Sequence, residues 1–100
     1  QHESYSGNLM LQSDGGGSDE SRAFVLELDI NGEQITGSAN VAGFEPFQVQ
    51  GQVLPRGVEL HLNNSVLGAR LSGGKRDRVL KGRFTMSDKH KGSWEVRKTN

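Results

Sequence analysis

Six basic residues in the C-terminal third of the chain form its clearest chemical pattern. They are Lys75, Arg76, Arg78, Lys81, Arg83 and Arg97. Lys81 and Arg83 are two residues apart, so in a strand their side chains share one face, and Arg97 falls in the next predicted strand. Cations gathered on one face can bind phosphates, anionic lipid headgroups or acidic proteins. The pattern predicts a basic face that binds a partner. The simpler explanation is a charged surface that only faces solvent.

The aromatic residues argue against nucleic acid as that partner. Proteins that bind single strands without sequence preference place exposed aromatic rings among the basic residues, so that bases can stack on them. Here most aromatic residues fall on the apolar face of the predicted strands. We therefore expect a protein partner at the basic face.

Residues that could support catalysis or hold a metal ion are scattered. The three histidines share no regular spacing: they are His2, His61 and His90. The chain has no cysteine, so a zinc site has little support. Three carboxylates in a glycine-rich stretch lack the spacing of an EF-hand calcium loop: Asp14, Asp19 and Glu20. No Gly-x-Ser-x-Gly or Walker sequence occurs, and we predict no enzyme activity, no cofactor and no metal.

Four aromatic side chains are expected on the inner face of the sheet. They are Tyr5, Phe24, Phe84 and Trp94. Around a hollow interior they could hold a small apolar molecule, which gives the alternative function of a ligand carrier. The simpler explanation is that the rings fill the interior. The predicted inner face carries no ionisable group except the Tyr5 phenol, which argues against catalysis inside.

Composition and charge indicate one small domain with a lean core. The 100 residues are 32% hydrophobic, with a mean hydropathy of −0.63, and no apolar run is long enough to span a bilayer as a helix. Residues 1–50 hold eight acids and one base, a net charge of −7, whereas residues 51–100 hold eleven bases and four acids, a net charge of +7. Such asymmetry predicts either an interaction surface or attraction between the two halves of one sheet.

A five-residue pattern, apolar–x–Gly–x–apolar, occurs four times. Its glycines are Gly7, Gly37, Gly51 and Gly82. In a strand each glycine lies on the apolar face between two apolar neighbours, where it permits a sharp bend or a close backbone approach. The pattern predicts a sheet that curls strongly, as in a small closed barrel.

Alternating apolar and polar residues predict eight strands and no helix. The expected strands are 5–12, 23–30, 34–41, 47–54, 58–62, 67–71, 78–86 and 93–97. Asn31-Gly32 predicts a tight hairpin between the second and third. Residues 1–4 are expected to be a disordered tail, and residues 13–20 and 72–77 flexible loops. Residues 5–100 are then one domain.

Short links between sequential strands favour an eight-stranded antiparallel up-and-down barrel, with a β-sandwich as the alternative. A five-stranded oligonucleotide-binding barrel would leave three segments unexplained. The meander, which ends in Gly92-Ser93-Trp94-Glu95-Val96-Arg97, resembles the small barrels of avidins and lipocalins, the calycin shape. Lipocalins carry Gly-x-Trp on the first strand and this chain carries it on the last. The resemblance therefore implies a shape and no site residues.

Overall fold

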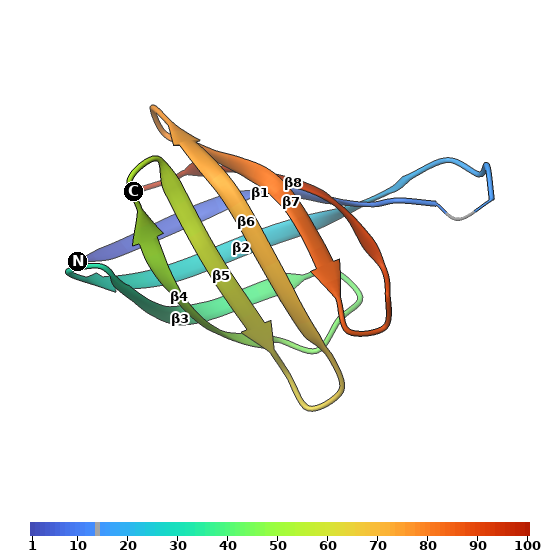
Figure 1. The fold of residues 1–100 in the computed structure, drawn as a ribbon, viewed down its shortest axis with the longest axis horizontal. Coiled ribbons are helices and arrows are strands. Elements are labelled where there is room, and N and C mark those ends of the chain that lie inside the picture. Colours follow the sequence, from blue (N-terminus) through green and yellow to red (C-terminus); the bar gives the residue numbers. More distant parts are fainter. Residues whose placement is uncertain (14) are drawn as a thin grey trace.

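The predicted eight-stranded barrel is confirmed. The computed structural model describes residues 1–13 and 15–100, and its strands form one closed antiparallel barrel in sequence order, without a helix in those ranges (Figure 1). The strands are β1 (His2–Leu11), β2 (Glu20–Asn31), β3 (Gln34–Val41), β4 (Phe47–Leu54), β5 (Gly57–Asn63), β6 (Gly68–Arg76), β7 (Val79–Met86) and β8 (Lys91–Lys98). β1 closes the barrel by pairing with β8 as well as with β2.

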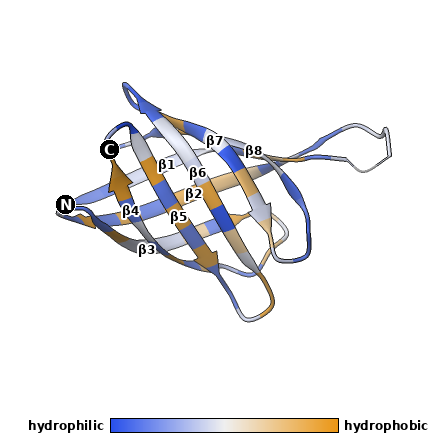
Figure 2. Ribbon diagram, in the orientation of Figure 1, coloured by the Kyte–Doolittle hydropathy of each residue, from blue (hydrophilic) through white to orange (hydrophobic). Residues whose placement is uncertain are grey.

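Alternation along each strand builds the core. Apolar residues point into the barrel and polar residues point out. Figure 2 shows hydrophobic and hydrophilic colours alternating along the strands. On β3, for example, Ile35 and Ala39 are buried while Thr36 and Ser38 are exposed. Because the inward apolar faces of the strands meet inside the closed sheet, the 21 buried hydrophobic residues among those described belong to one core cluster.

The four pattern glycines lie on the inner side of the strands, where neighbouring backbones approach closely. A Cβ atom on any of them would overlap a carbonyl oxygen of the neighbouring strand: Glu95 for Gly7, Glu27 for Gly37, Glu59 for Gly51 and Ser72 for Gly82. Only a residue without a side chain allows such close backbone approach. The interpretation of these glycines as bend positions agrees with this packing.

The expected tail at residues 1–4 is ordered instead. His2 to Ser4 belong to β1 and pair with residues 27–29 of β2. The Gln1 amino group donates a hydrogen bond to the Ile30 carbonyl oxygen at 3.0 Å. The prediction was wrong because it stopped the strand where the apolar alternation ends, whereas backbone pairing with β2 continues to the end of the hairpin.

The expected flexible loop at residues 72–77 is also wrong, because β6 continues through Arg76. Its two glycines suggested a loop, but one of them, Gly73, is needed for close packing inside the sheet. Gly73 faces Gly82 across the β6–β7 pair, and a Cβ on Gly73 would lie 2.6 Å from the Trp94 ring. Only residues 77 and 78 turn, with Asp77 at a φ of 57°.

The β2–β3 hairpin forms as predicted, with its turn one residue later. Asn31 pairs with Gln34, so Gly32 and Glu33 are the central residues. Gly32 has a φ of 65° and takes the first central position, the pattern of a type II′ turn.

The β1–β2 hairpin projects beyond the other strands (Figure 1). The predicted loop at 13–20 lies here, although Glu20 already belongs to β2. The Glu20 carboxylate forms an ion pair with the Arg22 guanidinium at 2.6 Å. Asp14, one of the three clustered carboxylates, lies outside the described residues.

Candidate functional site

An open groove crosses the outer face of β7, β8 and β1, with a volume of about 710 Å³. Outward side chains of the three strands line it: Ser6, Asn8, Met10, Lys81, Arg83, Ser93, Glu95 and Arg97. Gly7 and Gly82 contribute to its lining from the inner side of the sheet. Two positions where neighbouring strands approach closely thus also line this groove.

Three of the predicted basic residues meet in this outer groove. Lys81 and Arg83 come from β7 and Arg97 from β8, and all three are exposed. None of the three side chains makes a hydrogen bond or ion pair with any other residue that the structure describes. Their charges are therefore available to an anionic partner.

The other three predicted basic residues lie elsewhere. Arg78 donates hydrogen bonds to the carbonyl oxygens of Lys98 and Asn100, both at 3.0 Å, and so holds the C-terminal residues against β7. Lys75 is close enough to the Glu3 carboxylate to lower its pKa. Arg76 ends β6. The six residues thus form one cluster of three and three separate positions.

A second hollow of about 320 Å³ extends the groove toward the base of the β1–β2 hairpin. It shares Met10, Arg83 and Ser93 with the outer groove and adds Asp19 and Gln12. Arg83 lies where the two hollows join. A ligand in the outer groove could therefore extend along this side of the barrel past Arg83.

The four predicted inner aromatic residues are all buried in one core. Phe24 meets Trp94 edge to face, with ring centroids 6.1 Å apart. The Trp94 indole nitrogen donates to the carbonyl oxygens of Arg83 (3.1 Å) and Ser72 (3.3 Å), and the Tyr5 hydroxyl donates to Glu3 (2.6 Å). The polar atoms of Trp94 and Tyr5 are thus hydrogen-bonded within the protein. This favours the interpretation that the rings fill the interior. The carrier role stays a prediction.

One carboxylate lies inside the barrel end, where the sequence indicated only the Tyr5 phenol. Glu3 is 5% exposed and its carboxylate also accepts a hydrogen bond from Gln1 and lies 3.6 Å from the Lys98 amino group. Burial raises the pKa of Glu3, but the Tyr5 hydrogen bond and the charges of Lys75 and Lys98 outweigh it, and the net shift is downward. Burial and this hydrogen bond raise the pKa of Tyr5. Continuing the alternation back from Tyr5 would have placed Glu3 inside.

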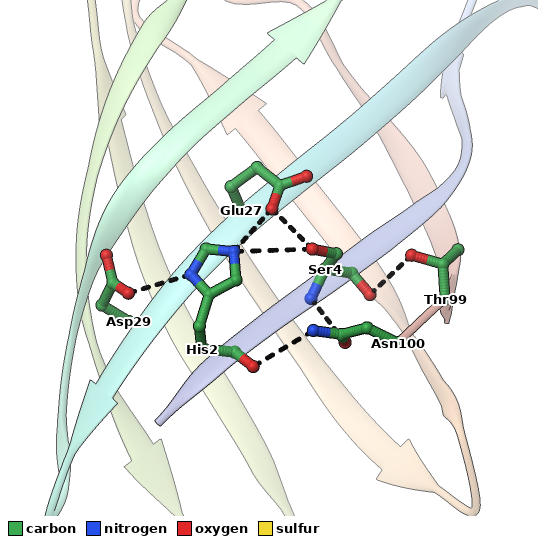
Figure 3. Close-up of polar contacts among 6 residues, drawn as sticks. All are labelled: His2, Ser4, Glu27, Asp29, Thr99 and Asn100. Carbon is green, nitrogen blue, oxygen red and sulfur yellow. Dashed lines mark hydrogen bonds and ion pairs between the residues drawn. The ribbon is translucent and has the colours of Figure 1, made fainter.

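A polar network at the start of β1 is the second feature that sequence spacing missed (Figure 3). His2 Nδ1 lies 2.9 Å from Asp29 and its Nε2 lies 2.7 Å from Glu27, while Ser4 donates to the same Glu27 oxygen at 2.6 Å. Thr99 and the Asn100 side chain bond the backbone carbonyls of Ser4 and His2. The β1–β2 register brings His2 and Ser4 to Asp29 and Glu27, and the β1–β8 pairing brings Thr99 and Asn100 beside them.

The network combines Ser, His and Asp, but its hydrogen bonding does not suit nucleophilic catalysis. A catalytic base needs a free ring nitrogen to accept the serine proton. Here both nitrogens of His2 face carboxylates, and Ser4 donates to Glu27 while its oxygen lies 3.5 Å from the ring. Hydrogen bonds to Asp29 and Glu27 raise the pKa of His2 and so favour the imidazolium. The arrangement is an ion-pair network that joins β1 to β2.

This ion-pair network gives a pH-dependent stability. The folded-state pKa of His2 is above its unfolded value of about 6.5, so its contribution is complete below that pH and is lost as the pH rises through the folded value. We expect His2→Gln to lower the melting temperature more at about pH 5.5 than at about pH 9.

The matched control places His2→Gln in a background of Glu27→Gln and Asp29→Asn, where its effect should not depend on pH. Thermal unfolding followed by circular dichroism measures both pairs. An equal effect at the two pH values in the unmodified chain would contradict the network.

Comparison with protein-family models, with curated protein sequences and with solved structures gave no significant match. The described residues include no helix of the length and apolarity that crossing a membrane requires.

Proposed function

We propose that the protein is a non-enzymatic interaction module that binds an acidic protein segment in its outer groove. The observation that carries this proposal is the set of three exposed cations, Lys81, Arg83 and Arg97, which have no partner among the described residues. Cations held close together on a rigid sheet raise the local potential and attract anionic ligands. Neighbouring hydroxyl and amide groups of Ser6, Asn8 and Ser93 can add hydrogen bonds.

The ligand that fits best is a peptide in an extended conformation. The groove lies over extended strands. The outward side chains of Lys81 and Arg83 are two residues apart along β7, a spacing of roughly 6.6 Å. Acidic side chains at alternate positions of an extended peptide have the same spacing. All six aromatic rings are buried or half-buried, so base stacking, the usual basis of sequence-tolerant nucleic-acid binding, has no exposed ring to use.

Charge reversal in the outer groove tests this function. Fluorescence anisotropy would follow a labelled peptide of about ten residues in which Glu and Ser alternate, roughly 33 Å long when extended. Lys81→Glu combined with Arg83→Glu should weaken binding at low salt by about tenfold or more, because repulsion replaces two attractive contacts. Added salt should also weaken binding of the unmodified protein.

The matched control reverses two exposed cations outside the groove, Arg56 and Lys89, and changes the net charge equally. It should retain most of the affinity. If both double variants lose affinity equally, attraction depends on net charge alone and the outer groove is not the binding site.

A further inference from the structure

One acidic residue lies within the otherwise basic outer groove. Glu95 is on β8, directly opposite Lys81 of β7 and Asn8 of β1. Arg97 follows two residues later on the same outer face of β8. Glu95 is exposed and, like the cations around it, makes no ion pair or hydrogen bond with another described residue. Its charge is not neutralised by a contact within the protein.

A carboxylate in this position discriminates among anionic ligands. A uniform polyanion, such as a nucleic-acid backbone or an all-acidic peptide, would bring like charge against Glu95 wherever it fills the groove. Such a charge gives specificity by repulsion: it weakens the binding of a ligand with like charge more than it strengthens the binding of the preferred ligand. A peptide of mixed sequence avoids this repulsion by placing a cation opposite Glu95 while its acids face the surrounding Lys and Arg.

We propose that Glu95 favours an acidic peptide interrupted by a single Lys or Arg residue over uniform polyanions, which bind the outer groove more weakly. This inference rests on the proposed function of the outer groove. The ligand class is an extended segment whose acids meet Lys81, Arg83 and Arg97 and whose basic side chain pairs with Glu95. Glu95 is then a specificity-determining residue.

The experiment compares two labelled peptides of identical composition and length, with Lys either at the centre of an acidic stretch or at its end, and a labelled oligothymidylate. The unmodified protein should bind the central-Lys peptide about fivefold more tightly than the terminal-Lys peptide, the effect of one exposed ion pair. Glu95→Gln should abolish this difference and increase affinity for the oligothymidylate. The control, Glu33→Gln, removes an exposed carboxylate in the β2–β3 turn and should leave the preference unchanged.

The outcomes separate this inference from the proposed function. Equal binding of the two peptides, a preference that survives Glu95→Gln, or tighter binding of the oligothymidylate than of either peptide by the unmodified protein would overturn the selective role of Glu95. Absence of binding to every anionic probe would overturn the proposed function itself. Circular dichroism of Glu95→Gln confirms that the barrel is intact.

Discussion

Gly82→Val is expected to destabilise the barrel by roughly 1–3 kcal/mol or more. A Cβ atom at this position would overlap the carbonyl oxygen of Ser72 and the Cα atom of Gly73 on β6. These are backbone atoms of a paired strand, so they cannot move aside as a flexible side chain could. The strands would have to separate, which would weaken the β6–β7 hydrogen bonds and the packing of Trp94 on this part of the sheet. Denaturant unfolding measures the loss.

Gly82→Ala and Gly74→Ala form the matched pair for this prediction. Gly74 is one residue beyond Gly73 on β6, and its added Cβ would meet only the Arg56 carbonyl oxygen, at an ordinary 3.6 Å. Gly74→Ala should therefore be neutral or slightly stabilising, because alanine loses less conformational freedom than glycine on folding. If Gly82→Ala were equally well tolerated, close strand approach would not be the reason for the glycine.

Phe24→Ala is the second substitution with a large expected effect, a loss of about 3–5 kcal/mol. Phe24 is fully buried and packs edge to face against Trp94 in the core. Removal of the ring loses the free energy of its burial. It also leaves a cavity that the closed sheet can fill only partly by relaxing. Urea unfolding at equilibrium measures this loss.

The control for Phe24→Ala is Val25→Ala, since Val25 is the next residue on β2 and faces outward with 36% exposure. It should change stability by no more than about 1 kcal/mol. A small loss for Phe24→Ala would indicate an unfilled interior and would favour the ligand carrier. A bound apolar molecule should then be visible by native mass spectrometry of the purified protein.

Period-two alternation made the barrel predictable because nearly every strand has one buried and one solvated face. The prediction was wrong where local composition and tertiary packing disagree. Gly73 and Gly74 have the composition of a loop, but both lie in β6, and inside this barrel Gly73 provides space for the Trp94 ring and the backbone of β7. The ordered start of β1 was missed because its pairing with β2 is backbone hydrogen bonding, which carries no side-chain pattern.

Part of the outer groove could also be predicted. Lys81 and Arg83 share a strand face, and a short turn places Arg97 on the adjacent strand. The contribution of β1 follows only from closure between β1 and β8, which joins the two ends of the sequence. Sequence likewise could not indicate which cations are free: Arg78 resembles the others in type but is bound to backbone carbonyls near the C-terminus.

The most direct test of the binding groove is a nuclear magnetic resonance titration of ¹⁵N-labelled protein with the Glu–Ser peptide. Amide shifts should be largest along β7, β8 and β1, around Lys81, Arg83 and Arg97, and should diminish as salt is added. The opposite face, at the glutamine-rich outer side of β4, should change little. Shifts centred on β4, shifts spread evenly over the barrel, or no shifts at low salt would contradict the account.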